Sequence, residues 1–362
     1  MGMNETHDPS DPTLDDLAVY ALDAHDPAED AAISAYLDGV PGAARWERTL
    51  RDVAGEIGAA GAPDEDPPAD LGARVREAAV ARRAPAPRVS GASPVEVHRV
   101  EMSRLVLLLS DLGPDDWRAP VDPPEMAGWT VHDLAAHVMA NEALMADHLG
   151  DPVPGVTETA RDNENRTAEA QARHRDLPPA AAVVELEAAA EAVDTVVATI
   201  VATRGDAGLD DRIEWWAGPA SIRFLLLVRA FEAWTHADDV RRALGLPQVA
   251  PPLASLLTMT SSACGFVPGM LAARGAHHPG RVVRFRFSDL DPGAAWDVDL
   301  GVIGSARPAG DAGVDAELTI TALDFCRSIS ARRRPEDIEY GARGDTALAA
   351  EVVAALPALA FL

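Results

Sequence analysis

The chain has 362 residues, of which 48% are hydrophobic, and a formal net charge of −27 at pH 7 in which arginine supplies every cation. This length predicts two or three domains, each able to bury a core of its own. So acidic a chain repels phosphate backbones and anionic lipid surfaces. The composition therefore argues against direct nucleic-acid binding and against membrane association.

The N-terminal residues and the two cysteines bear on the cellular compartment. Residues 1–16 lack the basic and apolar regions of a signal peptide, and the longest apolar run, FLLLV at 224–228, is far shorter than the ~18 residues of a membrane span. We therefore expect a cytoplasmic protein. Cys264 and Cys326 have no paired spacing, so we expect buried free thiols rather than a disulfide or a cysteine-ligated zinc.

The first part of the chain reads as a small helical module followed by a linker. Within residues 1–58, the stretch 14–58 has apolar residues at spacings of three and four, typical of short helices. Residues 59–92 contain two segments rich in proline, alanine and glycine. Such a composition predicts a linker.

A four-helix bundle is predicted over residues 93–246. Its first helix begins after Ser93, because a proline follows and Glu96 has the spacing of a capping box. Thr130 and Asp133 have the same spacing before a second apolar stripe, which predicts the second helix.

The remaining bundle helices are indicated by composition and by a terminal glycine. Residues 180–203 are alanine-rich, with high helix propensity. Residues 220–244 form the fourth predicted helix, which ends at Gly245 as the expected C-terminal cap. Residues 151–177 are read as a longer polar crossover.

An α+β domain is predicted over residues 247–362. After a helical stretch to about residue 273, apolar and polar residues alternate in 282–290 and 295–300, the period of half-buried strands. Further elements are expected in this order: a strand in AELTITA (316–322), a helix in LDFCRSISARR (323–333), a strand in EDIEYG (336–341), and a last helix in DTALAAEVVAAL (345–356).

Three polar side chains in the predicted bundle have the spacing of a metal site. Glu232 and His236 are four residues apart, so on a helix they share one face and can reach one ion. His137, on the second helix, supplies a third ligand across the bundle. A surface hydrogen bond between Glu232 and His236, with His137 as a satisfied core histidine, explains the same spacing without a metal.

The motifs GWTVHDLAAHV and RAFEAWTHADDVRRALG resemble those of the mycothiol-dependent maleylpyruvate isomerase family. This resemblance implies a DinB-like four-helix bundle, followed by a sterol-carrier-like α+β domain. It also implies a divalent metal, usually zinc, held by His137, Glu232 and His236. Nickel, cobalt and iron suit the same ligand set.

The resemblance further implies thiol chemistry on a small anionic or electrophilic substrate. A zinc-activated thiolate of mycothiol would make the chain an isomerase or a thiol S-transferase-like enzyme. An arginine of the C-terminal domain is expected to assist, and Arg333 and Arg334 are the catalytic candidates from the run Arg332 to Arg334. The same cations would also complement the dipole at a helix C-terminus.

The N-terminal module resembles the domain of anti-sigma factors of the zinc-finger class. That class places a histidine and two cysteines where this chain has Tyr36, Val40 and Ala43, so no zinc is expected there. The alternative function is therefore a soluble anti-sigma factor, a regulator of transcription. It would bind a sigma factor through residues 14–58, and its metal-binding bundle would sense a thiol, a metal or a small ligand. The remaining histidines are read as structural or solvated.

Overall fold

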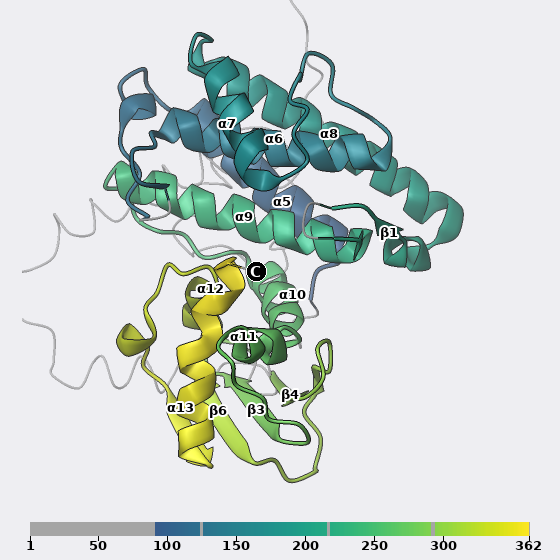
Figure 1. Ribbon diagram of the computed structural model, residues 1–362, viewed down its shortest axis with the longest axis vertical. Coiled ribbons are helices and arrows are strands. Elements are labelled where there is room, and N and C mark those ends of the chain that lie inside the picture. Colours follow the sequence, from purple (N-terminus) through teal and green to yellow (C-terminus); the bar gives the residue numbers. More distant parts are fainter. Residues whose placement is uncertain (1–90, 124–125, 216–217, 291–293, 362) are drawn as a thin grey trace, which may run out of the picture. The chain divides into compact units, whose positions relative to one another are not determined.

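The computed structural model describes residues 91–123, 126–215, 218–290 and 294–361 (Figure 1). The chain divides into two compact units, residues 1–85 and 86–362. The predicted helical module, residues 1–58, lies outside the described residues, as does the predicted linker 59–92 except for its last two residues. The anti-sigma-like function and its sigma-factor partner therefore stay predictions.

Four long helices build the bundle, and both predicted capping boxes are confirmed. The Ser93 hydroxyl accepts a hydrogen bond from the Glu96 amide, and the Glu96 carboxylate accepts one from the Ser93 amide. Thr130 and Asp133 do the same at the next helix. The four helices are α5 (Pro94–Ser110), α6 (Val131–Leu149), α8 (Pro179–Arg204) and α9 (Ile222–Ala243).

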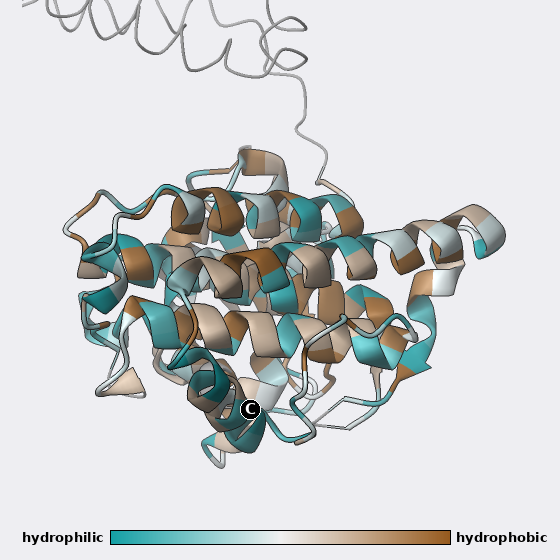
Figure 2. Cartoon of the chain, turned by 90° about the horizontal axis from the view of Figure 1, so that it is seen from above, coloured by the Kyte–Doolittle hydropathy of each residue, from teal (hydrophilic) through white to brown (hydrophobic). Residues whose placement is uncertain are grey.

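The bundle helices lie side by side, with α5 packed against α9 and α6 against α8 (Figure 1). Hydrophilic and hydrophobic residues are interspersed along each of them, as expected for helices with one buried face (Figure 2). A short ribbon of β1 (Arg212–Ile213) and β2 (Ala220–Ser221) precedes α9. The apolar core includes Met102, Leu134, Leu144, Val193 and Leu225.

The segment predicted to be a polar crossover contains a further helix, α7 (Asn163–His174). Asp162 caps its first turn by accepting a hydrogen bond from the Asn165 amide. Most of the side chains that α7 buries are polar, among them Arg166 and Thr167. The segment therefore lacks the apolar stripe by which helices are recognised in a sequence.

The C-terminal part contains a five-stranded sheet in the order β5-β4-β3-β6-β7. Strands β3 and β4 form an antiparallel hairpin, β3 and β6 run parallel, and β7 pairs antiparallel with β6. The predicted strand in EDIEYG is wrong in position, since β7 begins only at Gly341. The strands are β3 (Val282–Phe287), β4 (Ala295–Asp299), β5 (Arg307–Pro308), β6 (Ala316–Ile320) and β7 (Gly341–Gly344).

Helices cover this sheet and close a second apolar core. The rings of Phe285, Phe287 and Phe325 pack together, and Trp234 from α9 joins the same core. The mainly α architecture with an α+β part is thus confirmed. The helices are α10 (Leu253–Cys264), α11 (Val267–Ala273), α12 (Ala322–Ile329) and α13 (Thr346–Ala355).

Among the described residues, no single helix is long and apolar enough to cross a bilayer. Helices α10 and α11 have the length and apolar composition of a membrane span only when they are taken together. The two helices are bent by 49° relative to each other.

Candidate metal centre

Three predicted ligands, His137 of α6 and Glu232 and His236 of α9, meet at one point of the bundle. One ligand atom from each lies within 4.8 Å of the other two. The two imidazole rings stand edge to face with centroids 5.3 Å apart. His137 and His236 are only 7% and 5% exposed, whereas Glu232 is half-buried. The structure therefore brings these side chains together as a cluster of two nitrogen donors and one carboxylate.

Each histidine of the cluster is held through its Nδ1 atom. His137 Nδ1 lies 2.8 Å from the Thr167 hydroxyl of α7, and His236 Nδ1 lies 3.1 Å from Asp239 Oδ2. Because a carboxylate only accepts, His236 carries its proton on Nδ1. The Nε2 atom of His236 is then available for coordination, and that of His137 is available when the Thr167 hydroxyl accepts the Nδ1 proton. Metal-binding histidines are typically oriented in this way, so the residues present fit a metal ion.

Asp239 is itself fixed by an arginine of the C-terminal part. Arg332 donates from both Nε and a terminal nitrogen to the two oxygens of Asp239, each at 2.9 Å. Burial raises the pKa of Asp239, but its hydrogen bonds with His236 and Arg332 outweigh burial and lower the pKa to about 2. Asp239 therefore remains ionised and keeps the Nδ1 proton on His236.

The protonation state of His137 also suits a ligand. Burial lowers the pKa of His137 well below its usual value, and the nearby His236 and Arg229 lower it further. The ring is therefore neutral at neutral pH, with one nitrogen lone pair to offer.

Comparison with known proteins identifies the bundle. Residues 98–241 match the family model of the mycothiol maleylpyruvate isomerase N-terminal domain. The match covers most of the bundle, from α5 to α9. The matched segment contains His137, Glu232 and His236.

Two solved structures resemble a larger part of the chain. One is a histidine-to-alanine mutant of the mycothiol-dependent maleylpyruvate isomerase, 18% identical with a TM-score of 0.44. The other is the mycothiol-dependent maleylpyruvate isomerase, 16% identical with a TM-score of 0.43. Each likeness covers 68% of this chain and 91% of the other. The search of curated proteins gave no match.

Within the matched segment, a buried row of alternating charges stands behind Glu232. The Arg229 guanidinium donates to Glu232, to Glu142 of α6 at 3.0 Å, and to the Val138 carbonyl at 3.0 Å. Glu142 in turn lies 2.8 Å from His98 Nε2. Arg229, Glu142 and His98 are all fully buried. His98, one of the histidines read from the sequence as structural or solvated, is therefore a core residue.

The two arginines predicted to be catalytic, Arg333 and Arg334, lie outside the matched domain. Arg333 is 3.4 Å from Asp324, and the exposed Arg334 pairs with Asp337 at 2.8 Å. Among the described residues, neither forms a hydrogen bond or ion pair with the three ligands. Their catalytic assignment stays a prediction, whereas the preceding Arg332 reaches the cluster through Asp239.

Sequence reasoning missed the residues that support the ligands. Asp239 is three residues after His236 and Arg229 three before Glu232, so helical spacing contained a signal for both. Thr167 lies on the helix that was read as a crossover, and Arg332 is 93 residues from its partner. No local pattern points to either of these two.

Proposed function

We propose that the chain is a metal-dependent, mycothiol-linked isomerase or thiol S-transferase-like enzyme. His137, Glu232 and His236 hold its divalent metal, and zinc is the expected ion. The observation that carries the proposal is the close approach of these three donors, within 4.8 Å, with both histidines fixed through Nδ1. The matched domain, whose description names mycothiol and an isomerase, supports the choice of thiol and reaction.

The ligand set and its charge favour an anionic thiol and substrate. Two histidines and one carboxylate leave at least one coordination position open, as in catalytic rather than structural zinc sites. Because His137 is neutral, the three side chains together carry at most one negative charge. A divalent cation bound among them would therefore give the centre a net positive charge. A bound zinc would lower the pKa of a coordinated thiol, so that the thiolate predominates near neutral pH.

The protein's own residues position the centre. Asp239 fixes the ring of His236, and Thr167 fixes that of His137. Arg229 restrains the Glu232 carboxylate from behind, and its remaining hydrogen bonds tie it to α6. Ligands held in one arrangement lose less entropy when the ion binds. These contacts therefore favour one coordination geometry.

Elemental analysis of the purified full chain tests the metal. We expect about one metal ion per chain in the wild type, as for one three-ligand site, and loss of that ion from the His137→Ala and Glu232→Ala variants. His148→Ala removes another histidine of α6 and serves as the matched control, which should keep its metal. Retention of the metal by both ligand variants would refute the assignment, as would its absence from a well-folded wild type.

Titration with mycothiol tests the thiol separately. In the cobalt-substituted protein, a thiolate bound to the metal gives a charge-transfer absorption band in the near ultraviolet. We expect mycothiol to produce this band in the wild type and in His148→Ala, but not in Glu232→Ala. A metal-loaded protein whose spectrum is unchanged by mycothiol would retain the metal site and exclude the mycothiol-linked activity.

A further inference from the structure

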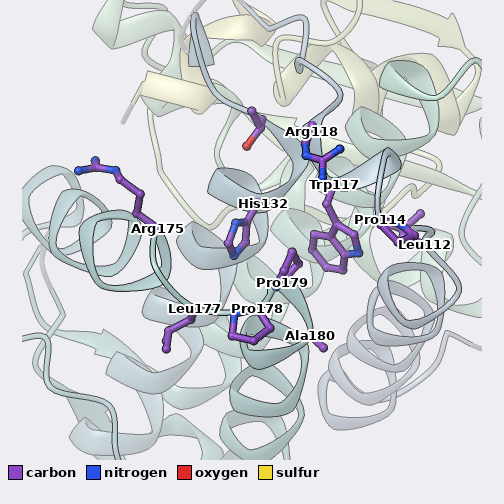
Figure 3. A pocket seen from close by; sticks show the side chains of 11 residues that line it. Leu112, Pro114, Trp117, Arg118, His132, Arg175, Leu177, Pro178, Pro179 and Ala180 are labelled. Carbon is purple, nitrogen blue, oxygen red and sulfur yellow. The ribbon is translucent and has the colours of Figure 1, made fainter.

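A cavity of about 480 Å³ opens at one end of the bundle, and none of the three metal-ligand candidates lines it. It is formed by η1 (Asp116–Arg118), the start of α6, and the turn that joins α7 to α8 (Figure 3). Its volume suffices for a small organic molecule. The residues that characterise it are Trp117, Arg118, His132, Arg175, Pro178 and Pro179.

The cavity contains an unsatisfied polar atom. The Nε2 atom of His132, a lining residue, is buried and has no hydrogen-bond partner among the described residues. Behind it, the ring of His174 stands edge to face at 6.1 Å, and its buried Nδ1 atom also has no partner there. An unpaired buried polar atom costs about 1–3 kcal/mol. Of these two nitrogens, His132 Nε2 belongs to a residue that lines the cavity, where an entering polar group would supply the missing partner.

His132 can pair with an acceptor while remaining neutral. Burial lowers the pKa of His132, and the neighbouring His174 lowers it further. His174 is held by Glu185, whose carboxylate lies 2.9 Å from its Nε2 atom. A neutral His132 with its proton on Nε2 can donate a hydrogen bond to an acceptor in the cavity.

The walls are apolar and the rim carries cations. Figure 3 shows His132 between Trp117 and Arg175, with Pro178 and Pro179 beside it and the Arg175 side chain extending outward from the rim. Among the described residues, the exposed Arg175 side chain has no ion-pair partner. On a chain with a net charge of −27, an unpaired guanidinium at an apolar cavity selects a negatively charged group. A carboxylate suits it, because guanidinium and carboxylate can form two parallel hydrogen bonds.

We infer that this cavity binds a small planar carboxylic acid. Its carboxylate pairs with Arg175 and accepts the His132 Nε2 proton, and its ring lies against Trp117 and the two prolines. The site goes beyond the proposed thiol chemistry and does not rest on it.

Benzoate is the probe, titrated into the full chain while the imidazole and indole NMR signals are followed. We expect shifts at His132 and Trp117 with a Kd of about 1 mM, the affinity of a fragment of this size. Arg175→Gln and His132→Phe should each weaken binding about tenfold. Arg274→Gln removes another exposed arginine that lacks an ion pair in the described chain, and it should bind like the wild type. Benzyl alcohol, which keeps the ring without the charge, should bind at least about tenfold more weakly.

The same titration with chelator present, and with His137→Ala, separates this site from the metal centre. Benzoate binding should be unchanged in both, whether or not the metal-dependent function holds. The inference is overturned if no shift appears up to about 20 mM benzoate, or if Arg175→Gln binds as tightly as the wild type. It is also overturned if the shifts occur at His137 and His236 instead. An ordered water that bridges His132 Nε2 and His174 Nδ1 in a benzoate-soaked crystal would also overturn the inference.

Discussion

Arg229 of α9 donates from Nε to Glu142 of α6 at 3.0 Å, and both side chains are fully buried. The pair joins two helices of the bundle directly behind the Glu232 carboxylate, to which Arg229 also donates. Removing one partner of a buried ion pair leaves the other charge uncompensated, which costs about 3–5 kcal/mol. The position of Glu232, a candidate metal ligand, is therefore tied to a charge pair that lies outside the three-residue cluster.

Glu142→Gln should weaken metal binding although Glu142 is not a ligand. The amide keeps the shape of the side chain but removes the charge that holds Arg229, so Glu232 loses its fixed partner. Changes of this kind lower metal affinity about tenfold to a hundredfold, and competition with a chelating dye measures the loss. Glu187→Gln, at an exposed position of α8, is the control and should bind metal like the wild type. Equal affinities in the two variants would refute the positioning role of Glu142.

Arg332→Met should lower metal affinity about tenfold, because Asp239 would lose the bidentate partner that orients it toward His236. Arg333→Met should leave metal affinity unchanged, since Arg333 pairs with Asp324. The chelator competition distinguishes the two variants. If Arg333→Met alone abolishes turnover while its metal remains bound, Arg333 is a catalytic residue as the sequence predicted. An unchanged affinity in Arg332→Met would refute the link from Arg332 through Asp239.

Local patterns sufficed to predict most of the helices and the three ligand candidates. Capping boxes at Ser93 and Thr130 depend on residues three apart, and both exist in the structure. Glu232 and His236 share a helix face for the same local reason, the period of the α-helix. Only the partnership with His137 needed more: the predicted bundle put the second helix opposite the fourth, and the family resemblance supported the same three residues.

The features that the sequence did not reveal depend on long-range pairing. Helix α7 was missed because most of the side chains that it buries are polar, Thr167 among them. Strand β7 has the sequence GARG and no alternating pattern; pairing with β6 defines it. Its Gly344 has φ +74°, and a Cβ there would lie 2.5 Å from the Asp315 carbonyl. Arg332 and Asp239 meet only because the C-terminal part packs on α9.

Cys264 and Cys326 should be unreactive in the native protein. Both are buried free thiols, as expected from their spacing. Burial raises the pKa of Cys326 to about 12 and that of Cys264 well above its usual value, so neither forms a thiolate near neutral pH. A thiol-specific chromogenic reagent should label neither cysteine in buffer and both in guanidinium chloride. Rapid labelling of the folded chain would contradict the buried position of these residues.

The pH dependence of stability should show the charge of His98. Burial lowers the pKa of His98, but attraction to Glu142 and Asp194 outweighs burial and raises the pKa to about 9. In the unfolded chain the pKa is about 6.5. Between these values the folded state holds a proton that the unfolded state has released. The free energy of unfolding therefore falls as the pH rises. The contribution of His98 is complete below about pH 6.5 and is lost as the pH passes about 9.

Denaturant unfolding of the metal-free protein at several pH values in this window measures the loss. A shift of this size corresponds to about 3 kcal/mol in the wild type, and His98→Gln should show a much flatter profile. Replacing the partly exposed His148 by glutamine gives the matched control, whose profile should follow the wild type. Parallel profiles for the wild type and His98→Gln would mean that His98 is neutral in the folded protein. The buried row from His98 to Glu232 would then lack its first positive charge, and Glu142 would be balanced by Arg229 alone.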